Sequence, residues 1–71
     1  MTETERANLF ARNVMNEILT LRGYRDGNAP TNVVKDVFRV MGSPTYSKAF
    51  AEHWSPEVTA QTLQNAAWDA M

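Results

Sequence analysis

The sequence predicts an all-α fold, a compact bundle of four short helices. Two observations lead to this prediction. Apolar residues recur at intervals of three and four, and glycine, proline and serine fall between these stretches, where helices end and begin. A chain of 71 residues forms one domain at most, so residues 1–71 are expected to make a single helical domain of low stability.

The first helix is predicted over residues 4–22. Thr2 or Thr4 can cap its start, and Gly23 is suited to a left-handed residue just past its end. The apolar seam of this segment, which is expected to face the core, consists of Ala7, Ala11, Val14, Ile18 and Leu21.

The second helix is predicted over residues 31–41, after a loop that contains Asp26-Gly27 and Pro30, with Thr31 as its cap. Its β-branched residues would suit a strand, but the apolar positions come in helical pairs. These positions are Val33, Val34, Val37, Phe38, Val40 and Met41.

The dipeptide Ser-Pro occurs twice, at Ser43 and at Ser55, and each copy predicts a helix start. Serine accepts a hydrogen bond from a free backbone N–H of the first turn, and proline at the next position lacks only an N–H that would be unpaired anyway. The two copies therefore predict helices over residues 44–54 and 56–70.

The lone histidine, His53, is expected on the core side of the third helix, together with Tyr46, Phe50 and Trp54. No cysteine and no second histidine are present to complete a transition-metal site or a catalytic triad. The three glycines are isolated and do not form a phosphate-binding loop. We therefore expect no enzyme, no cofactor and no metal.

Charge is unevenly distributed along the chain. All seven bases lie between residues 6 and 48 and outweigh three acids there, whereas the rest of the chain carries five acids and no base. The net charge of -1 is unlike that of a strongly basic nucleic-acid binder. The absence of cysteine and of any long apolar run predicts a cytoplasmic protein with no membrane segment.

A protein-binding face is predicted on the outer side of the fourth helix, around a tryptophan set among amides, which is the composition of a contact hot spot. Leu9 and Leu19 on the first helix also leave the apolar seam. The residues expected to contact a partner are Trp68, Val58, Gln61, Gln64, Asn65, Leu9, Leu19 and Met71.

These features favour a small regulator or inhibitor that docks on another protein, either directly or after pairing with a second copy of itself, as do many small products of phages and mobile elements. The alternative is a DNA-binding regulator, because residues 33–54 resemble a helix-turn-helix in the placement of Gly42 between two short helices. Phosphate contacts would then come from Lys35, Arg39 and Lys48.

Overall fold

The computed structural model confirms the all-α prediction and the number of helices. It describes residues 1–24 and 28–69, with residues 67–69 described by their backbone alone. No strand occurs in these two ranges. The helices are α1 (Glu3–Leu21), α2 (Thr31–Met41), α3 (Pro44–Ala51) and α4 (Pro56–Asp69).

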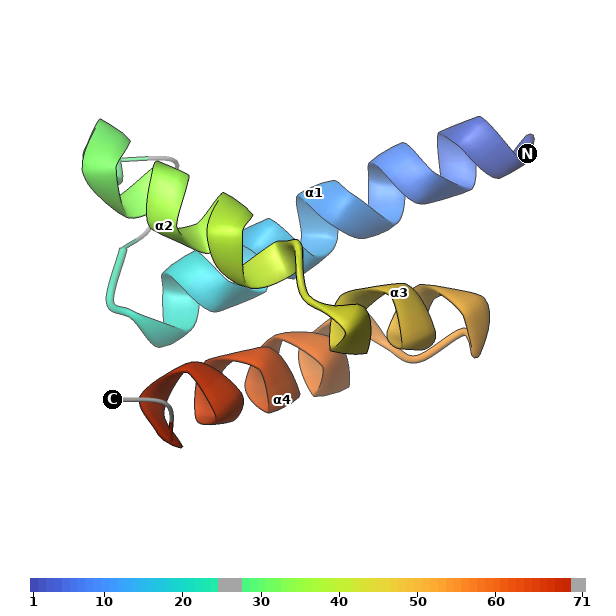
Figure 1. Ribbon diagram of the computed structural model, residues 1–71. Coiled ribbons are helices and arrows are strands. Elements are labelled where there is room, and N and C mark those ends of the chain that lie inside the picture. Colours follow the sequence, from blue (N-terminus) through green and yellow to red (C-terminus); the bar gives the residue numbers. More distant parts are fainter. Residues whose placement is uncertain (25–27, 70–71) are drawn as a thin grey trace.

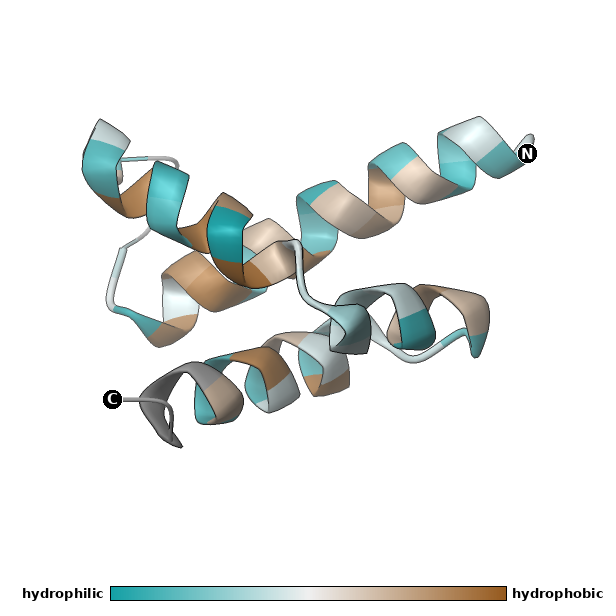
Figure 2. Ribbon diagram, in the orientation of Figure 1, coloured by the Kyte–Doolittle hydropathy of each residue, from teal (hydrophilic) through white to brown (hydrophobic). Residues whose placement is uncertain are grey.

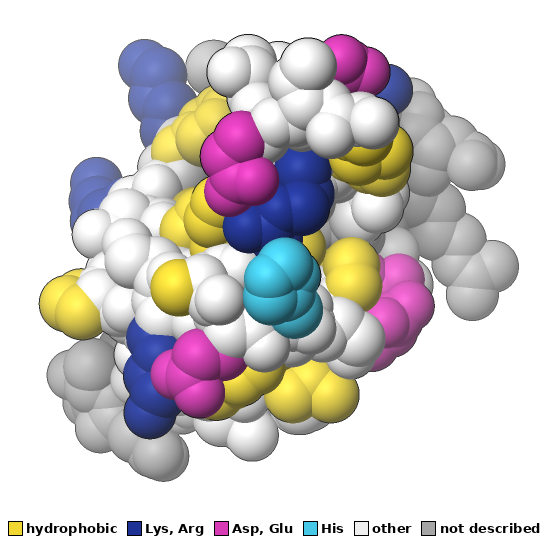
Figure 3. Space-filling model, turned by 90° about the vertical axis from the view of Figure 1, so that its right-hand side faces the viewer, with side chains coloured by type: hydrophobic (Ala, Val, Ile, Leu, Met, Phe, Trp, Pro, Cys, Tyr) yellow, Lys and Arg dark blue, Asp and Glu magenta, His cyan; other side chains and the backbone are white. Residues whose placement is uncertain are grey.

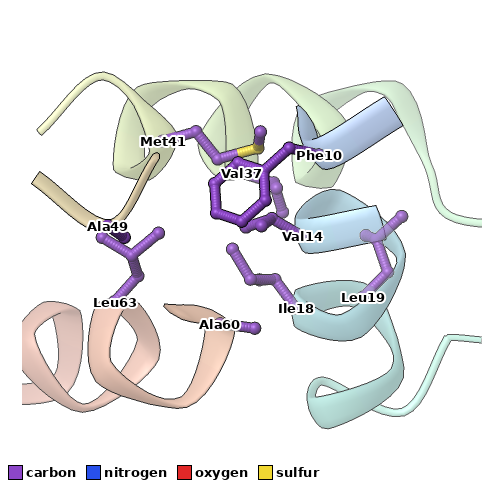
Figure 4. Close-up of a cluster of buried hydrophobic side chains, with 9 residues drawn as sticks. All are labelled: Phe10, Val14, Ile18, Leu19, Val37, Met41, Ala49, Ala60 and Leu63. Carbon is purple, nitrogen blue, oxygen red and sulfur yellow. The ribbon is translucent and has the colours of Figure 1, made fainter. Parts of the chain in front are cut away.

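Helix α1 is the central element of the molecule. In the view of Figure 1, α2 lies above and α4 below its C-terminal half, and these two helices also contact each other. Helix α3 lies near the N-terminal half of α1. Of the seam predicted for α1, Val14 and Ile18 lie in the core, and Phe10 joins them (Figure 4). Leu21 is 42% exposed, so its predicted place in the core is wrong, because the last turn of α1 buries Leu19 instead. The other helices add Val37, Met41, Ala49, Ala60 and Leu63. Figure 2 agrees with this core, since the hydrophobic segments of α1 and α2, drawn in brown, face each other.

The N-terminus of α1 begins as predicted. Thr2 is the cap, and its hydroxyl accepts a hydrogen bond from the Glu5 backbone N–H at 3.1 Å. Glu3 and Glu5 lie in the first turn, where the positive end of the helix dipole stabilises negative charge.

Helix α1 ends in a Schellman motif. Gly23 has a φ of 91°, Tyr24 N–H donates to the Leu19 carbonyl at 2.9 Å, and Gly23 N–H donates to the Thr20 carbonyl at 3.0 Å. The left-handed glycine predicted from the sequence is therefore confirmed.

Helix α3 ends in the same motif, three residues before its predicted end. His53 takes the left-handed position with a φ of 59°, and Trp54 N–H donates to the Ala49 carbonyl at 3.0 Å. The prediction that His53 lies inside the helix and in the core is wrong, since its side chain is exposed. Trp54 packs against the core as expected.

The capping predictions for α2 and α3 are only partly right. Pro30, not Thr31, occupies the cap position of α2, and no side chain caps that helix. Ser43 occupies the cap position of α3 with Pro44 behind it, but its hydroxyl makes no capping hydrogen bond. Ser55 does cap α4, because its hydroxyl accepts from the Val58 backbone N–H at 3.2 Å. None of the helices described is both long and apolar enough to cross a membrane.

Candidate protein-binding surface

The outer face of α4 leaves three of the predicted contact residues exposed. Val58, Gln61 and Asn65 are spaced three and four residues apart, so they lie on one stripe of the helix. The Val58 side chain is 55% exposed. Gln61 Nε2 donates a hydrogen bond to Asn65 Oδ1 at 3.0 Å, which holds the two amides in one orientation. The stripe is thus a partly ordered surface of one aliphatic and two amide side chains.

The fourth amide of the prediction, Gln64, is not part of this surface. Only 2% of Gln64 is exposed, because the side chain turns toward α1 and its Oε1 accepts a hydrogen bond from Arg22 Nε at 3.1 Å. A second branch of the same guanidinium, Nη1, donates to Asp36 Oδ2 on α2 at 2.7 Å. The expectation that Gln64 faces a partner is therefore wrong, and the residue instead belongs to a polar link between three helices.

The two leucines of α1 that were predicted to contact a partner differ in their exposure. Leu9 is 44% exposed, as expected. Leu19 is only 7% exposed, so its predicted exposure is wrong. The reason is the Schellman motif. In this motif the residue after the left-handed glycine normally packs over the third residue from the helix end, and these two residues are here Tyr24 and Leu19. Tyr24 packs against the same cluster that includes Leu19.

Two predicted contact residues lie outside what the structure describes. Trp68 is within the backbone range of α4, but its side chain is not among those described, and Met71 follows the last described residue. Their roles remain predictions.

One exposed aromatic residue was missed by the sequence reasoning. Phe38 on α2 is 57% exposed, although the sequence pattern placed it among the core residues of that helix. Helix α2 buries Val37 and Met41, and Phe38 lies about 100° around the helix from Val37. The signal for this exposure was present in the sequence, because six apolar residues in one short helix cannot all face one side.

The basic residues of the DNA-binding alternative are at the surface. Lys35 is exposed, and Arg39 is 82% exposed with its Nη1 3.7 Å from Asp36 Oδ1. Lys48 lies on α3, where its Nζ is 3.9 Å from Glu52 Oε2. Helices α2 and α3 make few contacts with each other and pack mainly on α1 and α4. This arrangement differs from a helix-turn-helix, in which the recognition helix packs on its supporting helix.

A cavity of about 220 Å³ opens where α2, α3 and α4 meet. Val40 and Leu63 provide apolar walls, and Arg39 stands at one side. Its other lining residues are Ser43, Thr45 and Ala66. The Ser43 hydroxyl oxygen is buried and has no hydrogen-bond partner among the described residues.

A polar cluster ties the N-terminal part of α1 to the end of α3. The Arg6 guanidinium stacks on the Phe50 ring at 3.8 Å from its centroid, and Arg6 Nη1 donates to the Phe50 carbonyl oxygen at 3.2 Å. The same nitrogen lies 3.4 Å from His53 Nδ1, and the single histidine is visible in cyan in Figure 3. The hydrogen bond from Arg6 lowers the pKa of Glu3, and burial beside Phe10 raises the pKa of Tyr46.

These contacts make the cluster a link between α1 and the end of α3. The Arg6 donors are directed at the Phe50 carbonyl, the Glu3 carboxylate and the His53 ring. No group of three or more metal-ligating side chains occurs in the described part of the chain.

Comparisons of the chain with protein-family models, with curated proteins and with solved structures found no match. The assignment of a function therefore depends on the surface chemistry described above.

Proposed function

We propose that this chain is a small, non-enzymatic, cytoplasmic protein that regulates or inhibits another protein by docking on it through the outer face of α4. The observation that carries the proposal is the exposed stripe of Val58, Gln61 and Asn65. An aliphatic side chain beside two amides can exclude water and also satisfy polar groups of a partner. Because the two amides already hold each other, less side-chain entropy is lost when they are covered.

The mechanism is steric, since docking requires no residue to change its chemical state. Leu9 on α1 is a second exposed apolar residue available to the partner, and the uneven charge along the chain orients the partner during encounter. A second copy of the chain that bound the same face of α4 would compete with the partner protein, because both would cover the same residues.

The test compares two substitutions at apolar positions of equal exposure, Val58→Asp on α4 and Phe38→Asp on α2. Tagged wild-type and variant chains are used to capture proteins from a nuclease-treated lysate of the source cells, and the retained proteins are quantified by mass spectrometry. We expect Val58→Asp to lose a protein that Phe38→Asp and the wild type retain. Circular dichroism controls for the fold of both variants.

Two results would overturn the assignment of the face. Loss with Phe38→Asp alone would move the contact to α2, and retention by both variants would show that neither face binds. The first result would make Phe38, an exposed aromatic residue, the anchor of the interface.

DNA binding is the second candidate function. The observation in its favour is that Lys35 and Arg39 are exposed one turn apart on α2. Replacing Lys35, Arg39 and Lys48 together by alanine would abolish binding to a fluorescent DNA duplex at low salt if this candidate is correct. Wild-type protein that leaves the anisotropy of the duplex unchanged would exclude it.

A further inference from the structure

The exposed face of α4 leads along the helix to the cavity at the junction of α2, α3 and α4. Val58, Thr62 and Ala66 follow one another at intervals of four residues and therefore lie in one row. Val58 and Ala66 are exposed, and Ala66 also lines the cavity. A partner that covers Val58 and continues along this row reaches the opening of the cavity.

The size and walls of the cavity suit one apolar side chain. Its volume of about 220 Å³ is below the roughly 300–1,000 Å³ of sites that bind drug-sized ligands or cofactors. Val40, Leu63 and Ala66 present only hydrocarbon to it. A phosphate group or a hydrated ion would gain nothing from these walls, whereas an aliphatic side chain would lose its contact with water there.

The rim of the cavity is suited to a negative charge. Arg39 stands at the rim with 82% of its side chain exposed, and its nearest acid is 3.7 Å away at Asp36 Oδ1. That carboxylate is already engaged more closely by Arg22, at 2.7 Å through Oδ2. The Arg39 guanidinium therefore retains donors for a second carboxylate.

The N-terminal end of α3 adds to this preference. Ser43 and Thr45 line the cavity, and the first turn of α3 contains no acidic residue that would offset the positive end of the helix dipole. The Ser43 hydroxyl is buried beneath the surface and has no partner among the described residues, so Thr45 supplies the accessible hydroxyl group. The residues that line the cavity thus include one base, Arg39, and no acid.

We infer that the cavity receives a segment of the partner protein in which a carboxylate lies next to an aliphatic side chain. The aliphatic group occupies the space between Val40 and Leu63, and the carboxylate binds the Arg39 guanidinium. This inference rests on the proposed function, because it specifies the chemistry of the partner that covers the same face of α4.

The probe for this chemistry is N-acetyl-L-leucine, which combines an isobutyl group with a carboxylate. It is titrated into the ¹⁵N-labelled full chain while backbone amide shifts are followed by NMR. We expect saturable shifts, with dissociation constants on the millimolar scale for so small a ligand, at Val40, Ser43 and Thr45. N-acetyl-L-leucinamide, which lacks the charge, should bind at least about tenfold more weakly, and sodium acetate, which lacks the isobutyl group, should not saturate the site.

Three variants locate the binding and control for charge. Arg39→Gln removes the cation at the rim, and Ala66→Phe fills the opening from an exposed position. Lys35→Gln removes a cation one turn away on the same helix and serves as the matched control. We expect the first two to weaken N-acetyl-L-leucine binding at least about tenfold and the control to leave it unchanged.

Each contrary result has a definite meaning. Equal binding of the leucinamide, or of acetate or inorganic phosphate, would overturn the combined apolar and acidic specificity, and no shift at the cavity would overturn the site. The proposed function is tested separately by Val58→Asp. A loss of capture by that variant, together with no binding of N-acetyl-L-leucine, would leave the protein-binding face intact and refute only the partner chemistry.

Discussion

Among single residues, Arg22 makes the most consequential contacts outside the apolar core. It sits directly after α1 and donates to Gln64 on α4 and to Asp36 on α2. Gln64 is nearly fully buried, so its carbonyl oxygen depends on this donor. Breaking the contact leaves a buried acceptor without a partner, which is more costly than the loss of an exposed ion pair.

Arg22→Ala is therefore expected to lower the free energy of unfolding by about 1–3 kcal/mol, the cost of leaving a buried polar group unpaired. Arg39→Ala is the matched control, because the Arg39 side chain is mostly exposed and its ion pair is long. The control should change stability by less than about 0.5 kcal/mol. Urea unfolding followed by circular dichroism measures both, and equal losses would contradict the role given to Arg22.

At the scale of secondary-structure elements, α1 and α3 end in the same way with different residues. Both use a left-handed residue followed by an aromatic one, Gly23 with Tyr24 and His53 with Trp54. Glycine adopts this conformation without a steric cost, whereas the same conformation costs free energy for a residue with a Cβ. The end of α3 is thus determined by the packing of Trp54 against the core and not by a favourable local sequence.

Substitutions at these two positions should have opposite effects. Gly23→Ala is expected to cost about 1–2 kcal/mol from backbone conformation alone, since a Cβ at Gly23 would meet no atom within 4 Å. His53→Gly is expected to raise stability by up to about 1 kcal/mol, because only a long and exposed contact with Arg6 is lost. Thermal unfolding of both variants tests the pair, and a destabilised His53→Gly would show that the Arg6 contact outweighs the backbone cost.

The two Ser-Pro starts are likewise unequal. Ser55 caps α4 with its hydroxyl, whereas the Ser43 hydroxyl is buried without a partner. Ser55→Ala should cost about 1 kcal/mol, the usual value of a lost cap. Ser43→Ala should cost less than about 0.5 kcal/mol or increase stability slightly, because it removes an unpaired buried hydroxyl. Chemical denaturation distinguishes the two, and a larger loss at Ser43 would contradict the structure.

At the scale of the whole molecule, stability depends on a small core arranged around one helix. Val14 and Ile18 of α1 are fully buried and lie between side chains of the other helices (Figure 4). A domain of 71 residues has a total stability of roughly 4–10 kcal/mol. A substitution that leaves a cavity in this core can therefore remove much of the total free energy of unfolding.

Ile18→Ala is expected to lose about 2–5 kcal/mol, because Ile18 is fully enclosed and the surrounding helices cannot collapse completely into the space. Ile18→Val should lose only about 0.5–1.5 kcal/mol. The melting temperature followed by circular dichroism should fall in that order. A small effect of Ile18→Ala would mean that the core is more plastic than its burial indicates.

Much of the fold was predictable because its signals are local. Apolar spacing, Gly23 and the two Ser-Pro pairs predicted Val14 and Ile18 as core residues of α1, the end of α1, the bounds of α2 and the starts of α3 and α4. The candidate site was predicted less well. Val58, Gln61 and Asn65 are exposed as expected, but no sequence pattern indicated that Gln64 would be drawn inward by an arginine 42 positions earlier.

The sequence by itself determined that this protein is helical, where its helices begin, and that Val14 and Ile18 of α1 lie in the core, because capping and periodicity act over a few residues. Only the tertiary structure decided which apolar and amide residues remain exposed. Leu19 is buried, Phe38 is exposed and α3 stops early at His53 because burial depends on the segments that pack over each position. The cavity beside Arg39 is of the same kind, since it exists only where three helices meet.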